Sequence, residues 1–73
     1  MVERASHAET VGVIGLGAMG LGTATALLEA GLAVIGCDIS DVAREAFESR
    51  GGTSVDTPAE LARRCSVVLV IVV

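Results

Sequence analysis

Three glycines near the start of the chain, Gly15, Gly17 and Gly20, have the spacing G-x-G-x-x-G. The first permits a tight turn, and the second, which lacks a Cβ, lets a phosphate group approach the main chain. The third lets a helix pack close to a strand. Because the motif follows a β-branched segment and opens a helical one, it predicts a loop that holds the pyrophosphate of a dinucleotide rather than a simple turn.

The residues around these glycines supply the donors that such a loop needs. Backbone amides at the start of the expected helix, those of Ala18, Met19 and Gly20, are predicted to face the diphosphate, aided by the positive end of the helix dipole. Leu16 belongs to the same predicted loop. The Met19 side chain has two interpretations that the sequence leaves open, packing at the helix start or a wall beside the cofactor.

An acidic residue, Asp38, stands 18 residues after the last glycine of the motif, at the end of the next apolar segment. At that place a carboxylate accepts hydrogen bonds from the adenosine ribose hydroxyls, although it could also be only a solvated acid. A 2'-phosphate would meet a like charge there, so the sequence predicts NAD in preference to NADP. Arg44, one helical turn further on, is the one cation nearby that could offset this repulsion.

The elements that must position these residues alternate along the chain. Strands are predicted over residues 10–16, 32–38, 53–55 and 67–73, and helices over residues 19–30, 40–50 and 58–64. The order β-α-β-α-β-α-β with right-handed crossovers predicts an α/β fold, part of a Rossmann-type doubly wound parallel sheet with strand order 3-2-1-4. We expect residues 1–9 to form an N-terminal tail, and residues 10–73 the first part of a dinucleotide-binding domain, truncated after strand 4.

Several local signals fix the expected helix ends. Gly31 provides a left-handed stop for the first helix, and either Ser40 or Asp41 can cap the second. Thr57 and Glu60 are spaced as a capping box around a proline at the first helical position.

Apolar and charged spacing predicts how the later elements pack. In the second helix we expect a core face and, on the wet side, an ion pair between Arg44 and Glu48; the core face comprises Val42, Ala43, Ala46 and Phe47. The seven apolar residues 67–73 are typical of a strand covered on both faces. If bare at a sheet edge, such a strand is an aggregation hazard.

Composition excludes several classes of protein. The 73 residues are 52% hydrophobic with a net charge of −4, five Arg, no Lys and one aromatic residue, which leaves one small domain and no nucleic-acid surface. Cys37 and Cys65 form no metal or disulfide pattern, and no metal site is expected. Residues 11–28 carry no charge, but five glycines dilute their hydropathy, so a membrane span is the weaker interpretation and a cytoplasmic protein is predicted.

Taken together, these segments resemble the N-terminal cofactor domain of the β-hydroxyacid dehydrogenase family, which includes 3-hydroxyisobutyrate, 6-phosphogluconate, tartronate semialdehyde and L-threonate dehydrogenases. The resemblance rests on Gly12-Val-Ile-Gly-Leu-Gly-Ala-Met-Gly20, Ala24, Leu27-Leu28, Ala30-Gly31, Cys37-Asp38, Thr57-Pro58-Ala59-Glu60 and residues 67–73. It is closest to the L-threonate branch. Members that use NADP tend to carry Asn-Arg where this chain has Asp38-Ile39, which also implies NAD.

The resemblance implies oxidation of a β-hydroxyacid by hydride transfer to the nicotinamide, with a later lysine as the acid/base group. This chain has no lysine, so no catalytic residue is assigned and the chain alone is expected to be inactive. The loop after the last strand contacts the nicotinamide side in the family, which implies that Val73 lies at the cofactor. The alternative is a non-enzymatic dinucleotide-binding module or redox sensor, completed by a partner chain or a further domain that covers the fourth strand.

Overall fold

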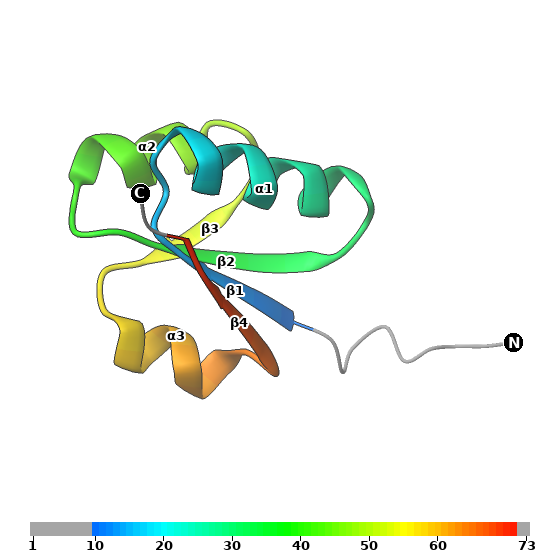
Figure 1. The fold of residues 1–73 in the computed structure, drawn as a ribbon, viewed down its shortest axis with the longest axis vertical. Helices are drawn as coiled ribbons and strands as arrows, with labels where there is room; N and C mark the ends of the chain where they lie inside the picture. Colours follow the sequence, from blue (N-terminus) through cyan, green and yellow to red (C-terminus); the bar gives the residue numbers. More distant parts are fainter. Residues whose placement is uncertain (1–9, 72–73) are drawn as a thin grey trace, which may run out of the picture.

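A computed structural model describes residues 10–71, which alternate strands and helices in the predicted order (Figure 1). The elements are β1 (Thr10–Ile14), α1 (Ala18–Glu29), β2 (Ala33–Cys37), α2 (Asp41–Glu48), β3 (Thr53–Val55), α3 (Pro58–Arg64) and β4 (Val67–Val70). All neighbouring strands are parallel, in the order β3-β2-β1-β4. The predicted fold class and strand order are therefore confirmed.

The sheet is covered by α1 and α2 on one face and by α3 on the other (Figure 1). Two apolar clusters fill these layers. On the α1 and α2 side the buried members are Val13, Leu16, Ala24, Val34 and Phe47. On the α3 side they are Ile35, Cys37 and Leu61. Successive residues of β2 alternate between the two clusters, as the two-residue period of a strand requires.

The caps that close α1 and open α2 are found as predicted, although α2 ends at Glu48 rather than at Arg50. Gly31, at φ +92°, follows α1, and the next amide, that of Leu32, donates back to the Leu27 carbonyl at 3.1 Å. Ser40, not Asp41, caps α2, since its Oγ accepts from the Ala43 amide at 3.2 Å.

The capping box at α3 is only half formed. The Thr57 hydroxyl accepts from the Glu60 amide at 3.2 Å, as predicted. The Glu60 carboxylate, however, forms ion pairs with Arg63 and Arg64 instead of the predicted hydrogen bond to the Thr57 amide. The basic end of this short helix therefore draws the side chain away from its beginning.

Two expectations for the first half of the chain are wrong in detail. The first strand ends at Ile14 instead of Leu16, because Gly15 turns the chain at φ +100° and the Leu16 side chain enters the core. In α2, Val42 is 76% exposed, since it lies in the first turn, off the stripe that buries Phe47.

The expected ion pair between Arg44 and Glu48 is also wrong. Arg44 is paired with Asp41, three residues before it, and Glu48 accepts a hydrogen bond from the Ser54 hydroxyl. Helical spacing allows Arg44 to pair with an acid either three residues before it or four residues after it, and spacing alone does not say which pair forms. The Arg44 side chain is thus directed toward the start of α2.

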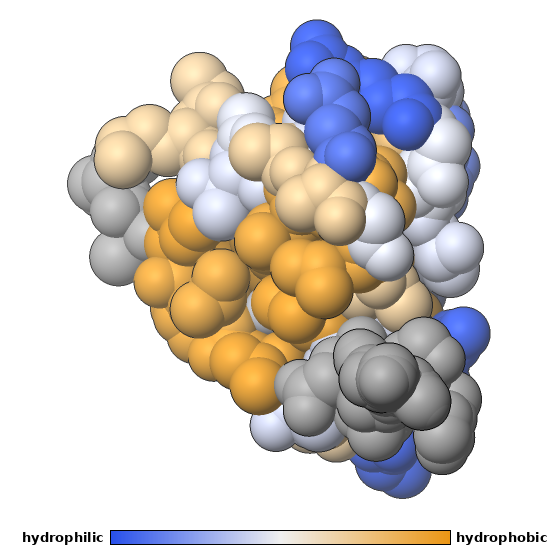
Figure 2. All heavy atoms as spheres, turned by 90° about the vertical axis from the view of Figure 1, so that its right-hand side faces the viewer, coloured by the Kyte–Doolittle hydropathy of each residue, from blue (hydrophilic) through white to orange (hydrophobic). Residues whose placement is uncertain are grey.

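The last strand differs most from expectation. β4 ends at Val70 and is a sheet edge within the described residues, with its four side chains 37–63% exposed rather than covered on both faces. Figure 2 shows a broad apolar surface on the side of the molecule seen there. The helices among residues 10–71 pack mainly on β1, β2 and β3 and leave β4 largely uncovered. An apolar run in the sequence does not show whether a helix covers the strand, so the exposure of β4 was not predicted.

The uncharged stretch 11–28 is divided between β1 and α1. Within residues 10–71, no helix is both long enough and apolar enough to cross a bilayer. The same residues contain no group of three or more potential metal ligands, and both cysteines are free thiols.

Candidate functional site

The loop between β1 and α1 is held by two glycines that accept no side chain. A Cβ at Gly15 would lie 2.2 Å from the Ile71 carbonyl oxygen, and the φ of +100° at this residue is strained for other amino acids. A Cβ at Gly20 would lie 1.6 Å from the Gly15 carbonyl oxygen. The first turn of α1 therefore rests directly on the main chain at the end of β1.

The second glycine of the motif faces open space. Gly17 is the N-cap of α1 with extended backbone angles, and a Cβ built there would have no heavy atom within 4 Å. A cleft of about 510 Å³ lies at this point. Its lining residues are Gly15, Gly17, Ala18, Met19, Gly20, Asp38 and Ile71.

The N-terminus of α1 is uncapped, unlike those of the other two described helices. Among residues 10–71 no side chain caps it, and its first turn holds no acid, whereas α2 and α3 have both a hydroxyl cap and an acid in the first turn. The hydrogen bond from Leu21 to Gly17, at 2.7 Å, is the first of the α1 ladder, so the three preceding amides have no partner within the helix. These amides and the helix dipole favour an anion from outside the chain.

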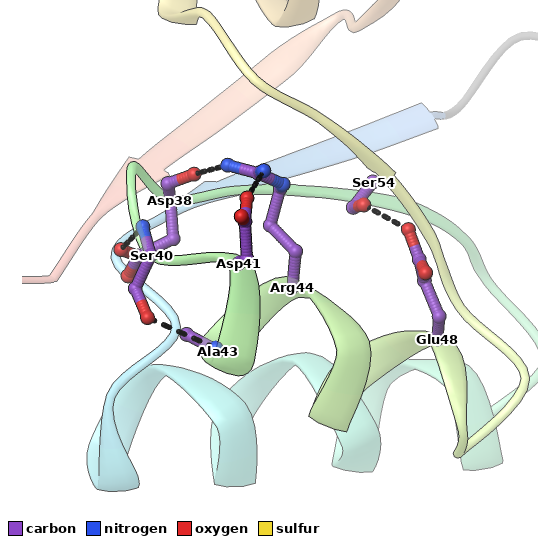
Figure 3. Close-up of polar contacts among 7 residues, drawn as sticks. All are labelled: Asp38, Ser40, Asp41, Ala43, Arg44, Glu48 and Ser54. Atoms are coloured by element: carbon purple, nitrogen blue, oxygen red, sulfur yellow. Dashed lines mark hydrogen bonds and ion pairs between the residues drawn. The ribbon is translucent and has the colours of Figure 1, made fainter.

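Asp38 lies at the end of β2 and joins the same loop. Its Oδ2 accepts from the Leu16 amide at 2.8 Å, and its Oδ1 accepts from the Ser40 amide at 2.9 Å (Figure 3 shows the second contact). The bond from Leu16, followed by that from Ser40, lowers the pKa of this carboxyl below its ordinary 3.8. The group is therefore ionised at neutral pH, and two of its roughly four lone-pair sites remain for a ligand.

Arg44 reaches Asp38 from the opposite side, at the main chain (Figure 3). Its Nη1 donates to the Asp38 carbonyl oxygen at 2.5 Å, and its Nη2 donates to the Asp41 carboxylate. The Arg44 side chain is 20% exposed and lines neither the glycine-loop cleft nor the apolar hollow beside it.

The structure brings most of the predicted site residues together. Six of them line the cleft: Gly15, Gly17, Ala18, Met19, Gly20 and Asp38. Leu16 is instead a core residue, 2% exposed, whose amide orients Asp38. Met19 is 64% exposed on the cleft wall, which favours the wall over the packing interpretation. Val73 lies outside the described residues.

Sequence reasoning missed three residues around the site. Ile71 closes the cleft, and the parallel register that pairs Ile14 with Val70 could have placed it there. Ile39 and Pro58 line a neighbouring hollow of about 200 Å³, which shares Asp38 and Gly15 with the cleft. No motif spacing marks them, because they come together only through the β2–α2 and β3–α3 connections.

Comparisons with known proteins agree with this geometry. A family model described as the NAD binding domain of 6-phosphogluconate dehydrogenase matches residues 10–73. An L-threonate dehydrogenase from Cupriavidus necator is 51% identical over 63 residues, and one from Escherichia coli K12 is 38% identical over 64 residues; each alignment covers 86% of this chain and 21% of the relative.

Two solved structures share the fold. The 3-hydroxyisobutyrate dehydrogenase from Salmonella typhimurium superposes with a TM-score of 0.81 at 32% identity, covering 89% of this chain and 23% of that one. An imine reductase variant from Myxococcus stipitatus, in complex with NAD+, superposes with a TM-score of 0.84 at 26% identity and the same coverage. The family match spans nearly the whole chain and includes the glycine loop and Asp38, so this chain belongs to the NAD-binding domain family of 6-phosphogluconate dehydrogenase.

Proposed function

We propose that these residues bind NAD for a dehydrogenase that oxidises a β-hydroxyacid by hydride transfer. The observation that carries the proposal is the start of α1, where three amides without a partner in the helix and an open Gly17 face a cleft with an ionised Asp38 on its wall. The proposed binding residues are Gly15, Leu16, Gly17, Ala18, Met19, Gly20, Asp38 and Val73.

The pyrophosphate has a preformed place at the start of α1. Its negative charge would complete the hydrogen bonding of the amides of Ala18, Met19 and Gly20, which lack partners within the helix. The helix dipole contributes up to about 2 kcal/mol for an anion in such a position. The absence of a side chain at Gly17 leaves the space that the phosphate oxygens require.

The site also offers what the adenosine half of NAD needs. The ionised Asp38 carboxylate accepts hydrogen bonds from the ribose diol, each worth about 1.5–3 kcal/mol with a charged acceptor. A 2'-phosphate would face the same negative charge, which favours NAD over NADP. The hollow lined by Ile14, Ile39 and Pro58 offers mainly aliphatic surface for the adenine ring.

The reaction is inferred from the relatives rather than from a catalytic group. When bound, NAD supplies the nicotinamide that accepts a hydride from the substrate carbon as the hydroxyl proton leaves to a base. The present residues hold and orient the cofactor, and since the chain contains no lysine we assign the acid/base group to the remainder of the whole protein. The L-threonate dehydrogenases among the relatives support a polyhydroxy acid as substrate.

The test is a titration of NADH into the purified chain, with folding verified by circular dichroism. We expect enhanced NADH fluorescence, with amide chemical-shift changes confined to the glycine loop, Asp38 and the adjoining hollow. Absence of binding at millimolar NADH in a folded sample would refute the proposal. Binding without oxidation of L-threonate or related acids by the whole protein would instead favour the non-enzymatic module.

We also propose a cytoplasmic location. The support is the free thiol state of Cys37 and Cys65, of which Cys37 is buried with a pKa raised chiefly by burial. Fractionation of cells that produce the whole protein tests this, and recovery from the membrane or an oxidising compartment would contradict it.

A further inference from the structure

We propose that Asp41 is a second determinant of NAD over NADP, because it holds the Arg44 guanidinium away from the ribose side of Asp38. The inference rests on the proposed function, since it assumes that the adenosine ribose is bound by the Asp38 carboxylate. Asp38 would then repel a 2'-phosphate, while Asp41 would withhold Arg44, a nearby cation that could attract it.

The geometry divides Asp38 into two sides. Its carboxylate is directed to the Leu16 and Ser40 amides, at the glycine loop. Its carbonyl oxygen, by contrast, accepts the hydrogen bond from Arg44 (Figure 3). One guanidinium nitrogen of Arg44 is therefore bonded on the main-chain side of Asp38, and the other is bonded to the Asp41 carboxylate.

The surroundings of Arg44 reinforce this placement. The guanidinium belongs to a different hollow, of about 450 Å³, between α2, β3 and the start of α3. Three further carboxylates line that hollow, those of Glu48, Asp56 and Glu60, so the local charge is complementary to the arginine. Asp41 lies outside that hollow, but it is the acid that pairs directly with the guanidinium, and its side chain is 78% exposed.

Asp41 is not needed for the other tasks at this helix start. The Ser40 hydroxyl already caps α2, and Asp38 is oriented by two main-chain amides. Removing one exposed member of a surface ion pair changes folding stability little, by up to about 1 kcal/mol. An Asp41→Ala variant is thus expected to fold while its Arg44 gains freedom to turn toward the cleft.

Arg44 is near enough to serve a 2'-phosphate once released. Its charge already contributes, as a minor cause, to the lowered pKa of the Asp38 carboxyl. A guanidinium bonds phosphate oxygens in pairs, and one added charge-assisted hydrogen bond corresponds to about a tenfold gain in affinity. The gain should appear most clearly when Asp38 no longer repels the phosphate.

The experiment measures NADH and NADPH affinities for four folded variants, each checked by circular dichroism: Asp38→Asn, Asp38→Asn with Asp41→Ala, Asp38→Asn with Glu45→Ala, and Asp38→Asn with Asp41→Ala and Arg44→Gln. Glu45 is an exposed acid on the same helix outside all three hollows, so its removal changes the net charge equally. We expect adding Asp41→Ala to raise the NADPH-to-NADH affinity ratio about tenfold, adding Glu45→Ala to change it less than twofold, and Arg44→Gln to abolish the gain.

An equal gain from the Asp41 and Glu45 replacements would overturn the inference, because it would reflect net charge alone. A gain that persists without Arg44 would overturn it too. Either result leaves the proposed function intact as long as the unmodified chain binds NADH. Failure of the folded, unmodified chain to bind NADH is the separate result that refutes the proposed function.

Discussion

Replacing Gly17 with alanine adds one methyl group to the cleft and disturbs little else. A Cβ at this position contacts no atom of the protein within 4 Å, and the backbone angles, φ −69° and ψ −167°, are accessible to alanine. Alanine is a poorer N-cap than glycine by about 0.5–1 kcal/mol, but it also restricts the unfolded chain by about 0.4–1 kcal/mol. We therefore expect nearly unchanged stability.

The same methyl group should strongly weaken cofactor binding. It would occupy the space through which the pyrophosphate approaches the amides of Ala18 and Met19. Losing one or two hydrogen bonds to a charged group, at about 1.5–3 kcal/mol each, raises the Kd by roughly tenfold to ten-thousandfold. NADH fluorescence titration measures the Kd, and thermal unfolding by circular dichroism measures the stability.

Gly22→Ala is the matched control. Gly22 also has no atom within 4 Å of a built Cβ, but it lies within α1 and does not line the cleft. Alanine in a helix interior is favoured over glycine by about 1 kcal/mol, so this variant should be more stable and bind NADH normally. If Gly17→Ala binds NADH as well as Gly22→Ala does, the pyrophosphate does not lie at the start of α1 and the reasoning fails.

Three further predictions concern the frame of the site. Gly20→Ala should destabilise the fold by about 3 kcal/mol or more, seen in urea unfolding, because its Cβ would lie 1.6 Å from the Gly15 carbonyl oxygen; a loss below 1 kcal/mol would contradict that packing. Because the pKa of Asp38 is lowered, its contribution to stability is present above pH 3.8 and is lost as the pH falls below that value. Asp38→Asn should therefore flatten the dependence of the melting temperature on pH in acid, and an unchanged dependence would exclude the contact between Asp38 and the Leu16 amide. Phe47→Ala should remove about 3–5 kcal/mol from the free energy of unfolding, because the ring is fully buried, and a small change would show that the core collapses around the gap.

The order of the strands and helices could be predicted because local signals marked each boundary. Gly31 and Thr57 act through backbone conformation and capping, which depend on residues close in sequence. The glycine motif and the spacing from it to Asp38 can also be recognised in the sequence without any tertiary information. These features explain why the fold class and most of the cleft lining followed from the sequence.

The errors have different causes. Val42 lies in the first turn of α2, off the stripe that buries Phe47, and was assigned to a face that it does not share, whereas the exposure of β4 depends on what the rest of the molecule places beside it. The partner of Arg44 was likewise decided by the main chain at Asp38, which the helix spacing does not include. Helical periodicity predicts which residues share a face, but not which acceptor a donor such as the Arg44 guanidinium will bond.

The three helix starts together explain why we place the cofactor at one connection of this sheet and not at the other two. All three helices follow a parallel strand, so each has amides at the carboxyl edge of the sheet that require acceptors. At α2 and α3 the acceptors are the hydroxyls of Ser40 and Thr57, and these helix starts are satisfied within the chain. At α1 the N-cap is Gly17, which has no side-chain acceptor to offer. Because the fold supplies the same amides three times, the residue at the cap decides whether they close a turn or remain for the cofactor.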